Sequence, residues 1–106
     1  MLEKITQLQE RYAELTRLME VNVDDYQKVA ELAKERSELE PIYQLANQYK
    51  DALAKLDQAR ELENSGDVEF MALAKSEIDT LTPEIEQIEQ QLKSMLVPKD
   101  PRDDHN

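Results

Sequence analysis

Apolar residues recur in alternating steps of three and four along most of this chain, the spacing that places side chains on one face of an α-helix. In the first stretch the pattern runs through Met1, Ile5, Leu8, Tyr12, Leu15 and Met19. It lapses over residues 21–24, where Asn22 suits a turn and Asp24 suits a helix N-cap. The pattern therefore predicts a first helix over residues 1–20 and a second helix that starts close to Asp24.

The second predicted helix covers residues 25–64 and carries an unusually wide apolar stripe. Its seam consists of Leu39, Ile42, Ala46, Tyr49, Leu53 and Leu56, widened on one side by Leu45, Ala52 and Ala59. A stripe of this width favours contact with two neighbouring helices. Pro41 falls on the outward face of this helix but removes a backbone donor. We therefore expect a kinked, continuous helix, with a break at Glu40–Pro41 as the alternative.

Residues 64–67 form the clearest turn, because Gly66 tolerates a left-handed conformation and Asp67 can cap the helix that follows. A third helix is predicted over residues 67–96. Its seam repeats in strict steps of three and four through Met71, Ala74, Ile78, Leu81, Ile85, Ile88, Leu92 and Met95. The register passes Pro83 without a phase change, so a kink is favoured over a stop at this proline.

These patterns predict an all-α fold: an antiparallel three-helix bundle, or long coiled-coil-like hairpin, over residues 1–96. Short connections make neighbouring helices antiparallel, and the unequal helix lengths leave the end near Gly66 only two helices thick. Residues 97–106 contain two prolines, five charged residues and a single apolar residue, so they cannot continue the helix. We interpret this segment as a linker from an N-terminal domain to a domain absent from this sequence.

The amino-acid composition excludes most classes of enzymatic and ligand-binding function. A single glycine excludes multi-glycine phosphate loops, the lack of cysteine excludes thiol chemistry, and the single histidine, His105, lies in the polar terminal segment. We therefore expect no enzyme activity, no cofactor and no metal site. The formal net charge of −11 argues against broad binding to nucleic acids or anionic membranes. Without a signal peptide or an apolar run long enough to cross a bilayer, the chain is expected to be a cytoplasmic monomer.

The exposed hairpin end is the candidate contact site for a partner, through Asn64, Gly66, Asp67, Glu69 and Phe70. Phe70 lies beside Val68 and Leu62, and these residues either close the turn or form an apolar docking spot. The chain also carries four tyrosines, Tyr12, Tyr26, Tyr43 and Tyr49, which could stack on RNA bases. Their helical spacing and acidic neighbours instead predict positions in the core or at its rim.

Several segments together resemble the N-terminal helical domain of bacterial peptide chain release factor 1, a prokaryotic class I release factor. The most specific is the exit segment, Leu96-Val97-Pro98-Lys99-Asp100-Pro101-Arg102-Asp103-Asp104-His105-Asn106. The helical part contributes Tyr26, Leu32-Ala33-Lys34-Glu35, Ser37-Glu38-Leu39-Glu40-Pro41-Ile42, Tyr49-Lys50, Asp67, Met71-Ala72 and Glu77-Ile78. This resemblance covers the whole chain, and it implies that residues 97–106 lead into an absent β-rich domain.

The resemblance implies a role in translation termination. Proteins of this family read stop codons and promote peptidyl-tRNA hydrolysis with a codon-reading loop and a Gly-Gly-Gln loop, neither of which this chain can contain. The family's first domain is non-catalytic; it reaches toward the ribosomal stalk-base proteins and interacts functionally with the class II release-factor GTPase. The alternative is a free-standing acidic helical adaptor, or a chaperone-like coiled coil. The composition alone is sufficient evidence for this alternative.

Overall fold

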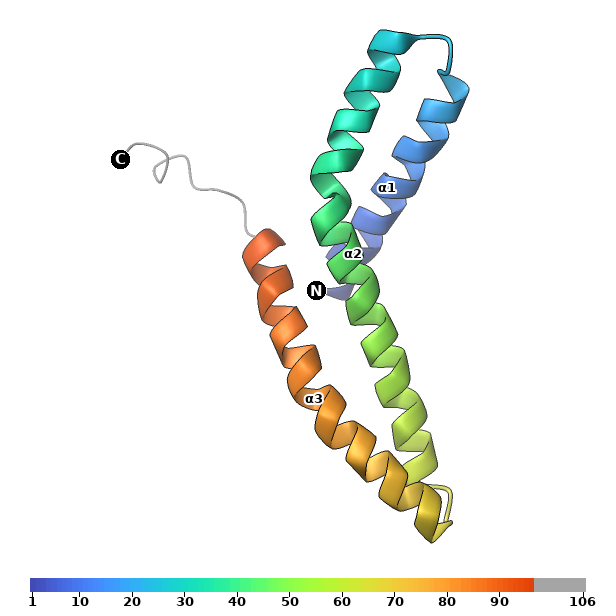
Figure 1. The fold of residues 1–106 in the computed structure, drawn as a ribbon, viewed down its shortest axis with the longest axis vertical. Coiled ribbons are helices and arrows are strands. Elements are labelled where there is room, and N and C mark those ends of the chain that lie inside the picture. Colours follow the sequence, from blue (N-terminus) through green and yellow to red (C-terminus); the bar gives the residue numbers. More distant parts are fainter. Residues whose placement is uncertain (97–106) are drawn as a thin grey trace, which may run out of the picture. The chain divides into compact units, whose positions relative to one another are not determined.

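The computed structural model describes residues 1–96, which form three α-helices joined by two short connections (Figure 1). Helix α1 spans Leu2–Val21, α2 spans Tyr26–Glu63 and α3 spans Val68–Leu96. No strand occurs in this part of the chain. The expected all-α class is confirmed, and each predicted helix boundary lies within one residue of the observed one. The predicted linker, residues 97–106, lies outside the described residues.

The helices are organised into two compact units that divide α2 between them. The first unit is Met1–Asn47, in which α1 packs against the N-terminal part of α2. The second unit begins at Gln48 and contains the rest of α2 with α3. In each unit the two helices are sequence neighbours joined by a tight connection, and they run antiparallel (Figure 1). The wide apolar stripe predicted on α2 is therefore used by a different helix in each unit.

The first unit has a thin core. Only two side chains of α1, Ile5 and Leu15, are buried. On the α2 side, the buried residues of this unit are Leu32, Ile42 and Ala46. Leu8, Tyr12 and Met19 of the predicted α1 seam are half-buried, and Met1 at its start is exposed. The predicted seam is therefore the buried face, although its first position has no cover.

The second unit has a longer and more continuous core. Its buried residues are Tyr49, Ala52, Leu56 and Ala59 on α2, facing Ala74, Leu81, Ile85, Ile88 and Leu92 on α3. The predicted seam of α3 is thus confirmed through its central part. Its first and last members, Met71 and Met95, are exposed, contrary to the prediction. Met71 lies in the first turns of α3, just past the connection at which α2 ends, so it has little of the facing helix to pack against.

Both internal prolines lie within continuous helices. Pro41 is inside α2 and Pro83 is inside α3, and each is exposed. The alternative of a helix break at Glu40–Pro41 is therefore wrong, and so is a stop at Pro83. Each proline lacks the backbone donor for the carbonyl four residues earlier, but an outward position leaves that carbonyl accessible to water.

A polar clamp joins the two helices of the second unit. The hydroxyl of Tyr49, a residue only 4% exposed, donates a 2.6 Å hydrogen bond to Oε1 of Glu89. Burial and, secondarily, the contact with this carboxylate raise the pKa of Tyr49 to about 12. Both effects favour the neutral phenol, because ionisation would place a second negative charge beside Glu89. The Tyr49–Glu89 bond therefore holds α2 and α3 together only while the phenol keeps its proton.

Replacement of the outward proline should stabilise the second unit. Pro83→Ala restores an N–H donor for the carbonyl of Asp79 and removes the steric cost of proline inside a helix, so we expect an increase in the free energy of unfolding of about 2 kcal/mol. Urea unfolding followed by circular dichroism measures this change. The neighbouring exposed substitution Glu84→Ala should stay within about 0.5 kcal/mol of wild type. Equal or lower stability of Pro83→Ala would contradict the expectation.

The Tyr49–Glu89 clamp predicts a dependence of stability on pH. Tyr49→Phe should lower the free energy of unfolding by about 1.5 kcal/mol at neutral pH, since it removes a hydrogen bond to a charged acceptor. The raised pKa of Tyr49 means that this contribution is complete below about pH 10 and is lost as the pH rises toward 12. The difference between wild type and Tyr49→Phe should therefore shrink over this interval. Tyr26→Phe, which removes the hydroxyl of an exposed tyrosine, is the control for residue type; a constant difference would refute the clamp.

Candidate docking surface at the hairpin end

The connection between α2 and α3 is held by its own backbone. The Asn64 N–H donates to the Glu61 carbonyl at 3.2 Å, and the Ser65 N–H donates to the Leu62 carbonyl at 3.1 Å. Gly66 follows with φ of 85°, in the left-handed region that residues with a Cβ rarely adopt. The predicted turn, with glycine at its left-handed position, is confirmed.

Asp67 caps the start of α3. Its Oδ1 accepts hydrogen bonds from the N–H of Glu69 at 2.9 Å and of Phe70 at 3.4 Å. The Asp67 N–H in turn donates to Oγ of Ser65 at 3.2 Å, and the Asp67 carbonyl accepts from the N–H of Met71 at 2.8 Å. These bonds satisfy donors that the first turn of a helix leaves free. The side chain of Asp67 therefore serves the fold first, and its substitution would unravel the surface beside it.

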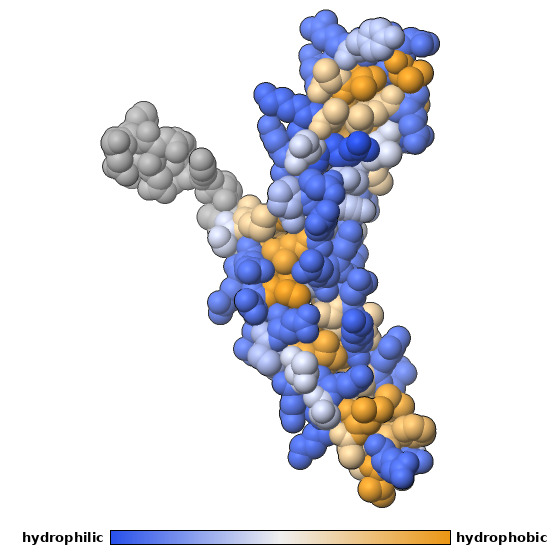
Figure 2. All heavy atoms as spheres, viewed as in Figure 1, coloured by the Kyte–Doolittle hydropathy of each residue, from blue (hydrophilic) through white to orange (hydrophobic). Residues whose placement is uncertain are grey.

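Four large apolar side chains lie exposed on the first turns of α3, and we refer to them as the tip patch: Val68, Phe70, Met71 and Leu73. Their exposures range from 40% for Met71 to 80% for Val68. Figure 2 shows hydrophobic side chains gathered at this end of the α2–α3 hairpin. Since backbone bonds and the Asp67 cap already close the turn, Val68 and Phe70 are not needed for that purpose. Their exposure favours the docking alternative over the closing one.

Acidic side chains surround the tip patch. Glu61, Glu63, Asp67 and Glu69 are all exposed within residues 60–69, and Arg60 is the only base in that stretch. An apolar patch inside a negative field is suited to a protein surface with an apolar recess and a basic rim. The same field repels phosphate groups.

The five candidate contact residues divide into two kinds. Asn64, Gly66 and Asp67 build the connection, whereas Glu69 and Phe70 present side chains that a partner could reach. Sequence reasoning missed Leu73 and assigned Met71 to the buried seam. Leu73 lies outside the three-four register of the α3 seam, and an apolar residue off the seam near a helix end was the signal that could have found it.

The α2–α3 hairpin also carries a shallow groove on its flank, with a volume of about 480 Å³. Its lining consists of Lys55, Gln58, Ser76, Glu77, Thr80 and Leu81. Small-molecule sites are usually enclosed and mostly apolar, with a few convergent polar groups. This open, mixed lining does not have that character, so the tip patch remains the better candidate.

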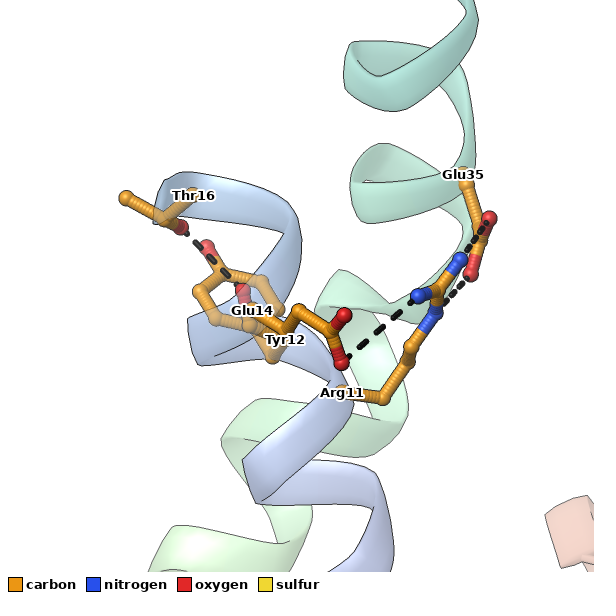
Figure 3. A network of polar contacts seen from close by, with 5 residues as sticks. All are labelled: Arg11, Tyr12, Glu14, Thr16 and Glu35. Carbon is orange, nitrogen blue, oxygen red and sulfur yellow. Dashed lines mark hydrogen bonds and ion pairs between the residues drawn. The ribbon is translucent and has the colours of Figure 1, made fainter. Parts of the chain in front are cut away.

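An ion pair connects α1 to α2 in the first unit (Figure 3). The Arg11 guanidinium donates from Nε to Oε2 of Glu35 at 2.6 Å and from Nη2 to Oε1 at 2.8 Å, while Glu14 lies 3.9 Å from Nη1. The hydrogen bonds from Arg11 hold the pKa of Glu35 below its usual value, and the same contact raises the pKa of Arg11. Such a bidentate contact fixes the relative orientation of the two side chains. Because the pair is exposed, solvent screens the attraction between its charges.

A second polar cluster surrounds Tyr12. Its hydroxyl donates to Oε2 of Glu40 at 2.6 Å, and its ring stacks on Tyr43 with centroids 3.7 Å apart. The guanidinium of Arg36 lies 5.8 Å from the Tyr12 ring centroid and donates to Oγ1 of Thr16 at 3.1 Å. The hydrogen bond between Tyr12 and Glu40 raises the pKa of the phenol and lowers the pKa of the carboxyl. The pKa values of Tyr12 and Glu40 are thus shifted mainly by the bond between them across two facing helices, which is typical of a helix interface and not of an acid–base site.

The tyrosines do not all behave as predicted. Tyr49 is buried, and Tyr12 and Tyr43 are half-buried against each other, so the core or core-rim expectation is confirmed for these three. Tyr26 is 86% exposed, and the expectation is wrong for this residue. Tyr26 is the first residue of α2, at a helix end where its side chain is left uncovered.

Among residues 1–96, no group of three or more His, Cys, Asp or Glu side chains is arranged to hold a metal ion. None of the helices in the same range is both long enough and apolar enough to cross a membrane.

Comparison with known proteins gives the chain a family. The model of the PCRF domain matches residues 8–106. The chain is similar over its full length to three proteins named peptide chain release factor 1: 36% identical to that of Exiguobacterium sibiricum, 39% to that of Halalkalibacterium halodurans and 38% to that of Bacillus subtilis. It spans only 30% to 31% of the length of these relatives. No solved structure matches it significantly. The chain belongs to the PCRF domain family.

Proposed function

We propose that this chain is the helical module of a translation termination factor and that it contributes docking instead of chemistry. The relatives that support this proposal are named peptide chain release factor 1 and align with the whole of this chain. In the complete factor, other domains would read the stop codon and promote hydrolysis of peptidyl-tRNA. A cytoplasmic location follows from that role.

The tip patch is the observation that supports a docking role. It places four apolar side chains on the first turns of α3, beside a connection whose geometry is fixed by backbone bonds, the Gly66 conformation and the Asp67 cap. A surface that is already ordered loses little conformational entropy when it binds. We propose that this patch contacts a ribosomal stalk-base protein and that the same end of the module communicates with the class II release-factor GTPase.

Charge favours a protein partner over RNA. The tip patch is surrounded by Glu61, Glu63, Asp67 and Glu69, and the described residues of the second unit carry eleven acids against five bases. This field would raise the rate of encounter with a basic protein and oppose contact with the RNA backbone. It also opposes pairing of two copies through the same patch, which is consistent with a monomer.

The proposed role assigns no reaction to these residues. Gly66 is the only glycine of the chain, so a Gly-Gly-Gln loop can lie only in another part of the complete factor. The groups with shifted pKa values, such as Glu35 and Tyr12, are engaged in contacts between helices. Binding is therefore the measurable property of this module.

Binding to ribosomes tests the tip patch directly. Phe70→Ser should weaken the affinity of a fluorescently labelled chain for 70S ribosomes of Bacillus subtilis by about tenfold, because buried aromatic anchors dominate interface energies. Met95→Ser is the matched control, since Met95 is 45% exposed at the other end of α3. An unchanged affinity for Phe70→Ser, or an equal loss for Met95→Ser, would remove the tip patch from the proposal.

Charge reversal tests the electrostatic part separately. Glu69→Lys should slow association with ribosomes about threefold and reduce the dependence of the association rate on salt, because one steering charge is inverted. Stopped-flow fluorescence at 50 and 200 mM salt measures both effects. Glu86→Lys, an exposed acidic residue of α3 away from the tip patch, should change the rate less. Faster association of Glu69→Lys would indicate an acidic partner surface, such as RNA.

A further inference from the structure

The connection between α1 and α2 carries a second group of exposed apolar side chains, which we call the connection patch: Val21, Val23 and Tyr26. Their exposures are 68%, 63% and 86%. Figure 2 shows hydrophobic side chains gathered at the end of the first unit where α1 and α2 are joined. Among the large hydrophobic side chains of the described residues, that of Tyr26 is the most exposed.

The backbone beneath the connection patch is ordered by local hydrogen bonds. The Asn22 N–H and its Nδ2 both donate to the Leu18 carbonyl, at 3.0 and 2.7 Å. The Asp25 N–H donates to the Asn22 carbonyl at 2.9 Å, and Oδ1 of Asp25 accepts from the Lys28 N–H at 3.1 Å. Both helix ends are therefore capped. The three apolar side chains project from a preorganised scaffold, which lowers the entropic cost of binding.

Local charge restricts what can bind to the connection patch. Glu20, Asp24 and Asp25 are exposed within residues 20–26, a stretch that contains no base. Phosphate-bearing partners and a second copy of this acidic chain would both meet repulsion there. A basic protein with an apolar recess complements the patch in both respects, since aromatic residues at such contacts supply much of the binding energy.

We propose that the connection patch is a second docking surface, distinct in sequence from the tip patch, on which a lysine- or arginine-rich ribosomal protein binds with Tyr26 as its anchor. This inference rests on the proposed function for the identity of the assembly that supplies the partner. It does not depend on the tip patch, because the two patches belong to different units and different helix connections.

Photocrosslinking distinguishes the two proposals. The photoreactive amino acid p-benzoylphenylalanine is placed at position 26, at position 70 in the tip patch, and at the exposed position 10 of α1 as a control. Each chain is irradiated with 70S ribosomes of Bacillus subtilis. We expect position 26 to crosslink a basic ribosomal protein at least fivefold more than position 10. The yield should fall when salt rises from 50 to 200 mM.

Each outcome has a defined meaning. Crosslinks from position 26 to rRNA, or a yield equal to that of position 10 while position 70 still crosslinks, would overturn the connection patch and leave the proposed function standing. Failure of all three positions would count against the ribosome as the partner. In a parallel affinity measurement, Tyr26→Ser should weaken ribosome binding about fivefold, whereas Tyr26→Phe should retain it. Unchanged helical circular dichroism in both variants separates a lost contact from a lost fold; equal affinities of wild type and Tyr26→Ser would contradict the anchor role.

Discussion

Burial of one apolar stripe on α2 is the interaction on which the rest of the structure depends. From Ile42 onward its buried residues follow at steps of three and four through Ala46, Tyr49, Ala52, Leu56 and Ala59. The N-terminal part of the stripe lies in the unit with α1, and the C-terminal part lies in the unit with α3. Neither α1 nor α3 can bury its own apolar face without this shared helix. A chain that is 35% charged thus folds around the apolar face of one helix.

The two units use this surface to different extents. Helix α3 contributes five buried side chains, whereas α1 contributes only Ile5 and Leu15. The α1–α2 contact is supplemented by polar pairs, including Arg11 with Glu35 and a 2.7 Å bond from Gln9 to Asn47. An exposed ion pair such as Arg11–Glu35 orients helices more than it stabilises them. Helix α1 is therefore the element expected to open at the lowest cost, because few buried apolar contacts oppose its separation.

Much of this fold could be predicted from sequence because helix periodicity and capping residues are local signals. The three helices, the left-handed Gly66 and the Asp67 cap follow from spacing and residue type alone. The errors have a common physical origin. Periodicity identifies a face that could be buried, but not whether another helix covers that face at its ends. Met71 and Met95 fit the seam of α3 and are nevertheless exposed in its first and last turns, and Tyr26 lies uncovered at a helix start.

The candidate site was harder to predict than the fold for the same reason. Asn64, Gly66 and Asp67 were identifiable as turn residues. Their hydrogen bonds and backbone conformation, however, serve to build the connection and not to bind a partner. The side chains available to a partner are instead ordinary apolar residues, such as Phe70 and Leu73, whose significance depends on exposure.

The distribution of exposed apolar residues also explains why contact surfaces would lie at the connections. Along the helices, the stripe of α2 is already occupied by α1 and α3, and the remaining faces are largely charged. Most of the exposed large apolar side chains instead lie at or beside the two connections, as Val23 and Val68 do, where the backbone is ordered by local hydrogen bonds. Acidic neighbours then keep these apolar groups soluble, oppose contact between copies and favour basic partners. The acidity and the exposed apolar residues are therefore parts of one proposed arrangement, in which charge would select the class of partner and the apolar side chains would supply the affinity.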